Sequence, residues 1–459
     1  MENVHSKKSG FFDMIKSMAQ TRSILQTKFT QLRQSILLRM QNRLFWRNSG
    51  LLLLANVIVT GLGLLRTPVM TWILPKAEVG MMGVIASWMP FVQLASLNGL
   101  DLASYHYISK GQSWAFVVNM LYRLRWTLFS TAIFLIGGAY WAWRGDTVLA
   151  WMFVITGVSF PVTSGMTYSA GLLSAQEKFV GLFWYRIWES LTDFTGFIPL
   201  AFSAWWISKV VTFYTANQIA TAIMQAGISF WFAWQLKRIN TPRMPKDDER
   251  AMIRYGKHLT VITAISVLQG RTDALLVGSL LSLTTMADYS IALMVTEQFR
   301  RLWGIYVSVR YPPLARMSVE RRRKKFIVEG GVIWLGFIGL GLLVSLLGHW
   351  LIPLILPPSY SGSLGYMDIL IATVLVGTPG ALVEIYFRTN QNTRSQYIIR
   401  IVSAVIGIIA PVLLILRWGA YGAASGRFLA NLVFSVLGFY LFLKDSKIIN
   451  KPDSSINGA

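Results

Sequence analysis

Several arginines lie inside long apolar stretches of the sequence, among them Arg66, Arg271, Arg301 and Arg427. An arginine at the centre of a bilayer costs about 3 kcal/mol even on the most permissive insertion scale. Such a residue therefore needs a carboxylate partner, a water-filled cavity or a route to the lipid headgroups. Guanidinium groups also offer planar, bidentate donors to phosphate oxygens. These four residues are candidates for lining an anion-binding cavity, and the alternative is that they only pair with carboxylates of neighbouring helices.

Four carboxylates inside apolar stretches are candidates for ion coupling: Asp101, Asp193, Asp273 and Glu297. The membrane interior favours the neutral form of a carboxyl group, so a change of protonation can drive a conformational change. Sodium would bind the same residues, and the sequence leaves the coupling ion open. Glu297 is spaced for pairing with Arg300 or Arg301 along a helix, whereas Asp273 is two residues from Arg271 and points to another face. Arg400 lies close enough to the end of its stretch to reach the headgroups.

A stripe of neutral polar residues at helical spacing predicts a cavity wall that donates and accepts hydrogen bonds, because it would be costly facing lipid. Its members are Asn217, Gln218, Thr221 and Gln225. Most of the 18 tryptophans lie at the ends of apolar stretches and fit an interfacial belt. Trp184 and Trp188, one helical turn apart, are better candidates for stacking on a ligand ring.

Other chemistries are excluded by what the sequence lacks. The chain has no cysteine, and its four histidines are scattered singly, so the sequence carries no cysteine or histidine metal motif. No phosphate-loop motif of the type G-x-x-x-x-G-K-[ST] occurs, so a site that hydrolyses nucleoside triphosphates is not expected. The sequence predicts no cofactor and no metal site.

Composition and segment lengths identify an all-α, polytopic membrane protein. Hydrophobic residues make up 54% of the 459 residues and charged residues only 14%, too few charges for a soluble surface of this size. Apolar runs of about 20 residues recur, which is the length a helix needs to cross the hydrocarbon core. We predict twelve spans: 49–74, 81–108, 120–143, 147–175, 180–207, 210–235, 258–280, 285–312, 328–348, 364–387, 395–416 and 419–443.

The distribution of basic residues predicts the topology. The net charge of +23 comes from residues that gather in alternate loops, chiefly 236–257 and 313–327. Lysine and arginine are enriched in cytoplasmic loops, so both termini are predicted to be cytoplasmic. The basic excess is then a topology signal, and no nucleic-acid partner is expected.

The spans divide into two sets of six, which indicates an internal duplication. The predicted organisation has five parts: a basic amphipathic cytoplasmic segment (1–48), a first six-helix bundle (49–235), a basic cytoplasmic linker (236–257), a second six-helix bundle (258–443) and a polar tail (444–459). The first segment is predicted to lie on the membrane surface, and the alternative is that it binds a partner protein. Gly422 and Gly426 form a small-residue pair that would let the last span approach a neighbour closely.

The corners between the first two spans of each half carry a family resemblance. The stretches 74–80 and 98–103, and in the second half 270–278 and 287–292, resemble bacterial polysaccharide-exporter flippases. These are the O-antigen and capsule branch of the multidrug/oligosaccharidyl-lipid/polysaccharide exporter superfamily, and the resemblance covers residues 49–443. It implies two six-helix bundles around a central cavity that opens alternately to either side.

The resemblance also implies an activity and its partners. The chain would move a polyprenyl-diphosphate-linked oligosaccharide across the bacterial cytoplasmic membrane, with membrane lipids and other polysaccharide-assembly proteins as further partners. The diphosphate would bind the cavity arginines, and the sugars would meet the polar stripe and the paired tryptophans. A small-molecule or drug antiporter with the same plan is the first alternative. A membrane glycosyltransferase or polymerase is the second, and the short external loops speak against it.

Overall fold

A computed structural model describes residues 50–201, 208–238, 240–315, 319–389 and 393–449. The predicted surface segment 1–48 and the last residues of the predicted tail lie outside this part of the chain. The described residues form helices and connecting turns without a strand, so the all-α prediction is confirmed. Six of their helices are long and apolar enough to cross a membrane by length and composition.

Among the described residues of the first half, helices cover each of the six predicted spans, and three of these spans are broken. After the helix Gly50–Ile73 come, in order, α2 (Lys76–Ala95), α3 (Gly99–Ser109), α4 (Ala115–Trp143), α5 (Thr147–Thr163), α6 (Ser169–Ala175), α7 (Phe179–Thr192), α8 (Phe197–Ala201) and α9 (Lys209–Arg238). The spans predicted at 81–108, 147–175 and 180–207 each consist of two helices. The first break follows from Leu97, whose φ of 53° ends the regular helix.

The second half contains the other six spans in longer helices. These are α10 (Lys246–Leu280), α11 (Leu283–Ala315), α12 (Val319–Ile355), a short 3-10 helix η1 (Pro358–Tyr360), α13 (Ser363–Thr389) and α14 (Thr393–Ile449). Helix α10 begins inside the predicted linker 236–257. Helix α14 contains the last two spans, joined at Gly419, whose φ of 54° lies in the left-handed region.

The chain doubles back at Gly419, as the contacts of two later glycines show. Gly422 lies against the backbone of Leu414, and Gly426 lies against that of Pro411. A side chain at either glycine would collide with this backbone, so the predicted close approach of the last span is confirmed.

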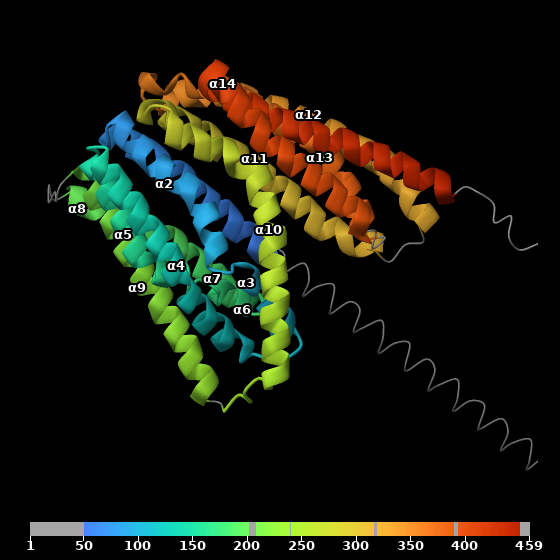
Figure 1. Cartoon of the computed structure of the whole chain (residues 1–459), viewed down its shortest axis with the longest axis horizontal. Coiled ribbons are helices and arrows are strands. Elements are labelled where there is room, and N and C mark those ends of the chain that lie inside the picture. Colours follow the sequence, from blue (N-terminus) through green and yellow to red (C-terminus); the bar gives the residue numbers. More distant parts are fainter. Residues whose placement is uncertain (1–49, 202–207, 239, 316–318, 390–392, 450–459) are drawn as a thin grey trace, which may run out of the picture.

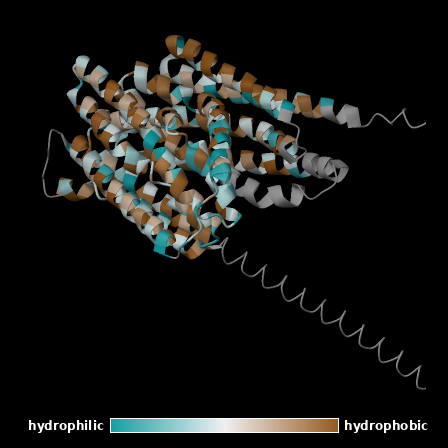
Figure 2. Cartoon of the chain, turned by 60° about the horizontal axis from the view of Figure 1, so that its bottom comes forward, coloured by the Kyte–Doolittle hydropathy of each residue, from teal (hydrophilic) through white to brown (hydrophobic). Residues whose placement is uncertain are grey.

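The two halves lie together at one end of the molecule and diverge toward the other (Figure 1). We call the end where α2 and α11 begin the predicted external end, and the opposite end, where α9 ends and α10 begins, the predicted cytoplasmic end. Hydrophobic residues run along most helices, interrupted by hydrophilic groups toward the middle (Figure 2). Many large apolar side chains are exposed, such as Trp143 at 84% and Leu416 at 80%, as expected where lipid replaces water.

Side chains of both halves hold the predicted external end closed. The Lys76 ammonium lies 2.7 Å from Asp288 Oδ2, donates to the Ser359 carbonyl oxygen, and lies over the Tyr360 ring at 5.3 Å. The Trp72 indole donates to the Ile355 carbonyl oxygen at 2.9 Å. These contacts join α2 and the helix before it to α11 and the α12–η1 turn, and we call them the external latch.

Candidate substrate pockets

The second half encloses a polar pocket of about 280 Å³. Helices α10, α11 and α13 and both parts of α14 supply its walls. The polar lining comes from Ser266, Gln269, Arg300, Thr373, Thr378, Glu384, Arg400, Arg427 and Asn431. Three of these side chains are guanidinium groups, so the pocket is rich in donors for an anion.

Glu297 is the centre of an arginine cluster beside this pocket. Its carboxylate lies 2.6 Å from Arg300, 3.4 Å from Arg271 and 3.5 Å from Arg427. Arg427 also lies 3.1 Å from Asp273 Oδ2. Three guanidinium groups thus face two carboxylates, and the arginine cluster has a formal charge of +1.

Solvent access differs across the arginine cluster. The Arg427 side chain is 5% exposed and that of Asp273 1%, and the Tyr289 hydroxyl donates to Asp273 at 2.5 Å. Arg271 and Arg300 are 32% and 47% exposed. Asp273, Arg427 and Tyr289 therefore form a buried base, and the two exposed arginines can be reached by a solute.

A second ion pair lies on the opposite wall of this pocket. Arg400 pairs with Glu384 at 2.5 Å and also donates to the Ser266 hydroxyl. The prediction that Arg400 reaches the headgroups is wrong, because a carboxylate of α13 lies within reach inside the bundle. This pair is neutral as a whole and leaves the charge of the arginine cluster unchanged.

The first half encloses a smaller polar pocket of about 250 Å³. Its lining combines one ion pair with neutral polar side chains: Arg66, Gln93, Thr163, Ser164, Asp193, Tyr214, Asn217, Gln218 and Thr221. Arg66 Nη1 lies 3.4 Å from Asp193 Oδ2, and its guanidinium lies over the Phe213 ring at 5.5 Å. The opposite charges cancel, so this pocket is neutral as a whole.

The two pockets occupy corresponding places in the two halves. Each is lined by the first, second, fourth, fifth and sixth span of its own half. This correspondence supports the predicted duplication. The halves differ in charge, because the pocket of the second half has the cationic excess.

The structure brings together most, but not all, of the predicted site residues. Arg66, Asp193, Asn217, Gln218, Thr221 and Arg427 line the polar pockets, and Arg271, Asp273 and Glu297 belong to the arginine cluster. Asn217 also has a structural task, since its amide oxygen accepts the Gly196 backbone N–H at 2.7 Å in the turn between α7 and α8.

The remaining predicted residues line neither polar pocket. Arg301 is exposed and donates to Gln298 on its own helix. Asp101 accepts two hydrogen bonds from buried Arg123, at 2.7 and 2.8 Å, and thereby ties α3 to α4. Trp184 and Trp188 are 54% and 59% exposed on the outer face of α7.

Gln225, the last member of the polar stripe, does not line the pocket of the first half. It is 1% exposed, accepts the Tyr185 hydroxyl at 2.8 Å and donates to Glu189 at 3.3 Å. It therefore links α9 to α7.

Arg300, Arg400 and Glu384 line the pocket of the second half, although none was predicted as a site residue. Arg300 could have been predicted by aligning the two halves of the sequence so that Leu74 matches Leu281. In that register Arg300 falls opposite Gln93, which lines the other pocket.

The fold and the two polar pockets define a polytopic membrane transporter built from two six-helix halves. A family model described as polysaccharide biosynthesis protein matches residues 45–318. The chain belongs to this polysaccharide biosynthesis family, and the resemblance seen in the sequence is confirmed.

Solved structures of other transporters have the same fold. An inward-facing multidrug resistance transporter of the MATE family aligns with a TM-score of 0.64 at 11% identity, over 87% of this chain and 96% of that one. The lipid II flippase MurJ in its inward closed conformation aligns with a TM-score of 0.63 at 13% identity, over 88% and 93%. A transporter from Pyrococcus furiosus aligns with a TM-score of 0.52 at 12% identity, over 87% and 95%. The comparison with curated proteins gives no match.

Proposed function

We propose that this transporter flips a polyprenyl-diphosphate-linked oligosaccharide from the cytoplasmic to the external leaflet of the bacterial cytoplasmic membrane, for surface polysaccharide export. The observation that carries the proposal is the cationic excess of the arginine cluster beside an accessible pocket. A diphosphate needs several guanidinium donors in a partly desolvated site, whereas a cationic drug would be repelled there.

Glu297 has a defined part in this mechanism. Its carboxylate contacts all three arginines and compensates part of their charge. A diphosphate carries more charge and more acceptor oxygens than a carboxylate, so it would take over the exposed arginines Arg271 and Arg300. Glu297 would then turn away or take up a proton, which is one way to couple an ion gradient to the change of state.

The neutral pocket of the first half suits the other part of the substrate. Gln93, Gln218 and Thr221 offer amide and hydroxyl groups without net charge. Neutral groups of this kind bind sugar hydroxyls. The lipid-linked substrate would thus place its charged linkage in the second half and its sugars toward the first.

The arrangement of the two halves supports access from the predicted cytoplasmic side. Their predicted cytoplasmic ends diverge, while the external latch holds the other end closed (Figure 1). A substrate assembled at the cytoplasmic face would therefore enter first from that side. Its release requires the external latch to break and the other end to close.

Proteoliposomes provide the direct test. Purified protein is reconstituted with a fluorescent polyprenyl-diphosphate oligosaccharide, and the fraction exposed to an added glycosidase is followed over time. We expect fast exposure with the wild type and none with Arg300→Ala. Arg250→Ala, a 76% exposed arginine outside both polar pockets, is the matched control and should keep the rate. Unchanged surface polysaccharide with new drug sensitivity after gene deletion would instead support an antiporter.

A further inference from the structure

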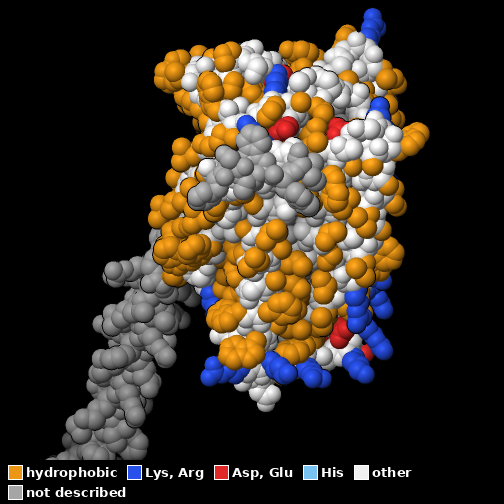
Figure 3. Space-filling view, turned by 90° about the vertical axis from the view of Figure 1, so that its left-hand side faces the viewer, with side chains coloured by type: hydrophobic (Ala, Val, Ile, Leu, Met, Phe, Trp, Pro, Cys, Tyr) orange, Lys and Arg blue, Asp and Glu red, His pale blue; other side chains and the backbone are white. Residues whose placement is uncertain are grey.

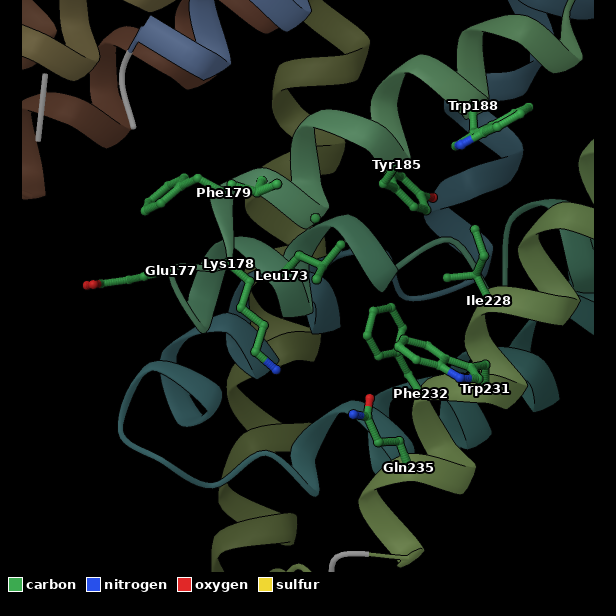
Figure 4. Close-up of a pocket in the computed structure, with 12 residues that line it drawn as sticks. Leu173, Glu177, Lys178, Phe179, Tyr185, Trp188, Ile228, Trp231, Phe232 and Gln235 are labelled. Carbon is green, nitrogen blue, oxygen red and sulfur yellow. The ribbon is translucent and has the colours of Figure 1, made fainter. Parts of the chain in front are cut away.

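A third pocket lies in the outer wall of the first half, near its predicted cytoplasmic end. Its volume is about 770 Å³, and it opens between α6 and α7 on one side and α9 on the other (Figure 4). Neither polar pocket shares a lining residue with it. It is therefore separate from the proposed substrate site.

The walls of this pocket are aliphatic and aromatic. Leu173, Tyr185, Ile228, Trp231 and Phe232 surround its space in Figure 4. The hydrogen bond from the Tyr185 hydroxyl to buried Gln225 closes the inner side.

Exposed apolar side chains flank the open side of the pocket, as expected for a surface that contacts the hydrocarbon of a membrane. Trp188 and Trp231 at its mouth are 59% and 52% exposed. On α9, Ile223, Phe230 and Trp234 are also exposed, and their spacing places them on one face of the helix. An exposed apolar face on a membrane helix contacts lipid, so a lipid chain can enter from the side.

Positive charge lies at the predicted cytoplasmic end of the pocket. Lys178 extends from the start of α7 toward the end where Gln235 lies, whereas the Glu177 carboxylate points away from the pocket (Figure 4). Lys237 and Arg238 occupy the last turn of α9. On the face shown in Figure 3, lysine and arginine side chains gather at this end of the molecule. In the predicted topology the cations would lie at headgroup level, with the apolar space deeper in the membrane.

We propose that this pocket binds an anionic glycerophospholipid of the inner leaflet, with an acyl chain between α7 and α9 and the phosphate on Lys178. The pocket matches such a lipid, because its apolar part can hold the acyl chain and its cationic end can bind the anionic headgroup. The polyprenyl carrier of the proposed substrate is a poorer match, because its far longer chain would extend well beyond the pocket. The inference does not depend on the proposed function.

Lipid retention by the full-length protein tests the proposal. Protein purified in detergent is incubated with phosphatidylglycerol or phosphatidylcholine, and bound lipid is counted by native mass spectrometry. We expect preferential retention of phosphatidylglycerol. Lys178→Gln should weaken it roughly fivefold, the effect of about one basic residue at a membrane surface. Ile228→Trp, which fills the pocket, should abolish retention, and Arg250→Gln should change nothing.

The outcomes separate this site from its alternatives. Equal retention of the two phospholipids by the wild type, or unchanged retention in both pocket variants, would overturn the proposal. Displacement of phosphatidylglycerol by an equimolar polyprenyl phosphate would assign the pocket to the carrier and overturn the choice of a phospholipid. Lys178 is exposed, so its variant keeps the test informative even if Ile228→Trp does not fold.

Discussion

Replacing Glu297 by Gln tests whether this carboxylate competes with the phosphates of the proposed substrate. The change removes one negative charge and preserves the size of the side chain, so the arginine cluster rises from +1 to +2. A unit charge about 4 Å away contributes about 4 kcal/mol at an effective dielectric constant of about 20. Arg271 and Arg300 are 32% and 47% exposed, so solvent screens their interaction with a charged ligand. We therefore take a contribution of about 1.4 kcal/mol to the binding free energy. The dissociation constant of a bound diphosphate should fall about tenfold.

The assay uses purified full-length protein and inorganic pyrophosphate as the probe. Binding is measured by isothermal titration at low and at physiological ionic strength, because salt screens the exposed arginines. We expect tighter binding by Glu297→Gln, with the larger gain at low salt. Flipping in proteoliposomes should slow, since a diphosphate held more tightly dissociates more slowly.

Asp368→Asn is the matched control. It also removes a carboxylate from the second half, but Asp368 pairs with His349 and lies outside the polar pockets. It should leave pyrophosphate binding unchanged. If Glu297→Gln binds pyrophosphate no better than the wild type while its thermal unfolding is normal, Glu297 does not compete for the arginines and the reasoning is refuted.

Three further predictions concern the same machinery. Arg427→Ala removes the cation that pairs with buried Asp273, so the free energy of unfolding should fall by about 3–5 kcal/mol. The measurement is the unfolding midpoint in detergent, and an unchanged midpoint would contradict the pairing. Arg271→Ala should abolish export without changing the protein level in the membrane, because Glu297 still pairs with Arg300 and Arg427. A surface-polysaccharide assay measures export and an immunoblot measures the protein level. Loss of the protein would mean that Arg271 has a structural role. Gly83→Cys with Ser290→Cys should cross-link the external end, since a Cβ at the glycine would lie 3.2 Å from that serine's Cβ. Oxidation should stop flipping in vesicles and reduction should restore it, with no effect on either single variant.

The fold was predictable because its signals are local and long. Twelve apolar stretches of membrane-spanning length were enough to place the helices, and alternating basic loops predicted the direction in which each helix crosses the membrane. The breaks were missed, because isolated glycines such as Gly165 and Gly196, which lie between the paired helices, also occur inside unbroken membrane helices. Leu97 takes a left-handed conformation with no glycine or proline beside it, and this follows from tertiary packing.

The partners of the charged residues were only partly predictable. Sequence spacing finds pairs on one helix, and it found Glu297 with Arg300. It cannot find the partner of Asp273, which is Arg427, 154 residues away. The same limit applies to Trp188: a hydropathy pattern places it on a helix but does not say whether that face meets the interior or the lipid.

The charge difference between the two pockets bears on the kind of cargo. A duplicated protein that moved a uniformly neutral or uniformly cationic molecule would have no use for a positive excess in one half alone. Here the ion pair of Arg66 and Asp193 is balanced, while Arg271, Arg300 and Arg427 outnumber their two carboxylates. A molecule with an anionic linkage between a sugar chain and a lipid has the same asymmetry. Its charged part would dock in one half and its neutral part in the other, so both halves would be held by one cargo, and their relative movement would carry that cargo across.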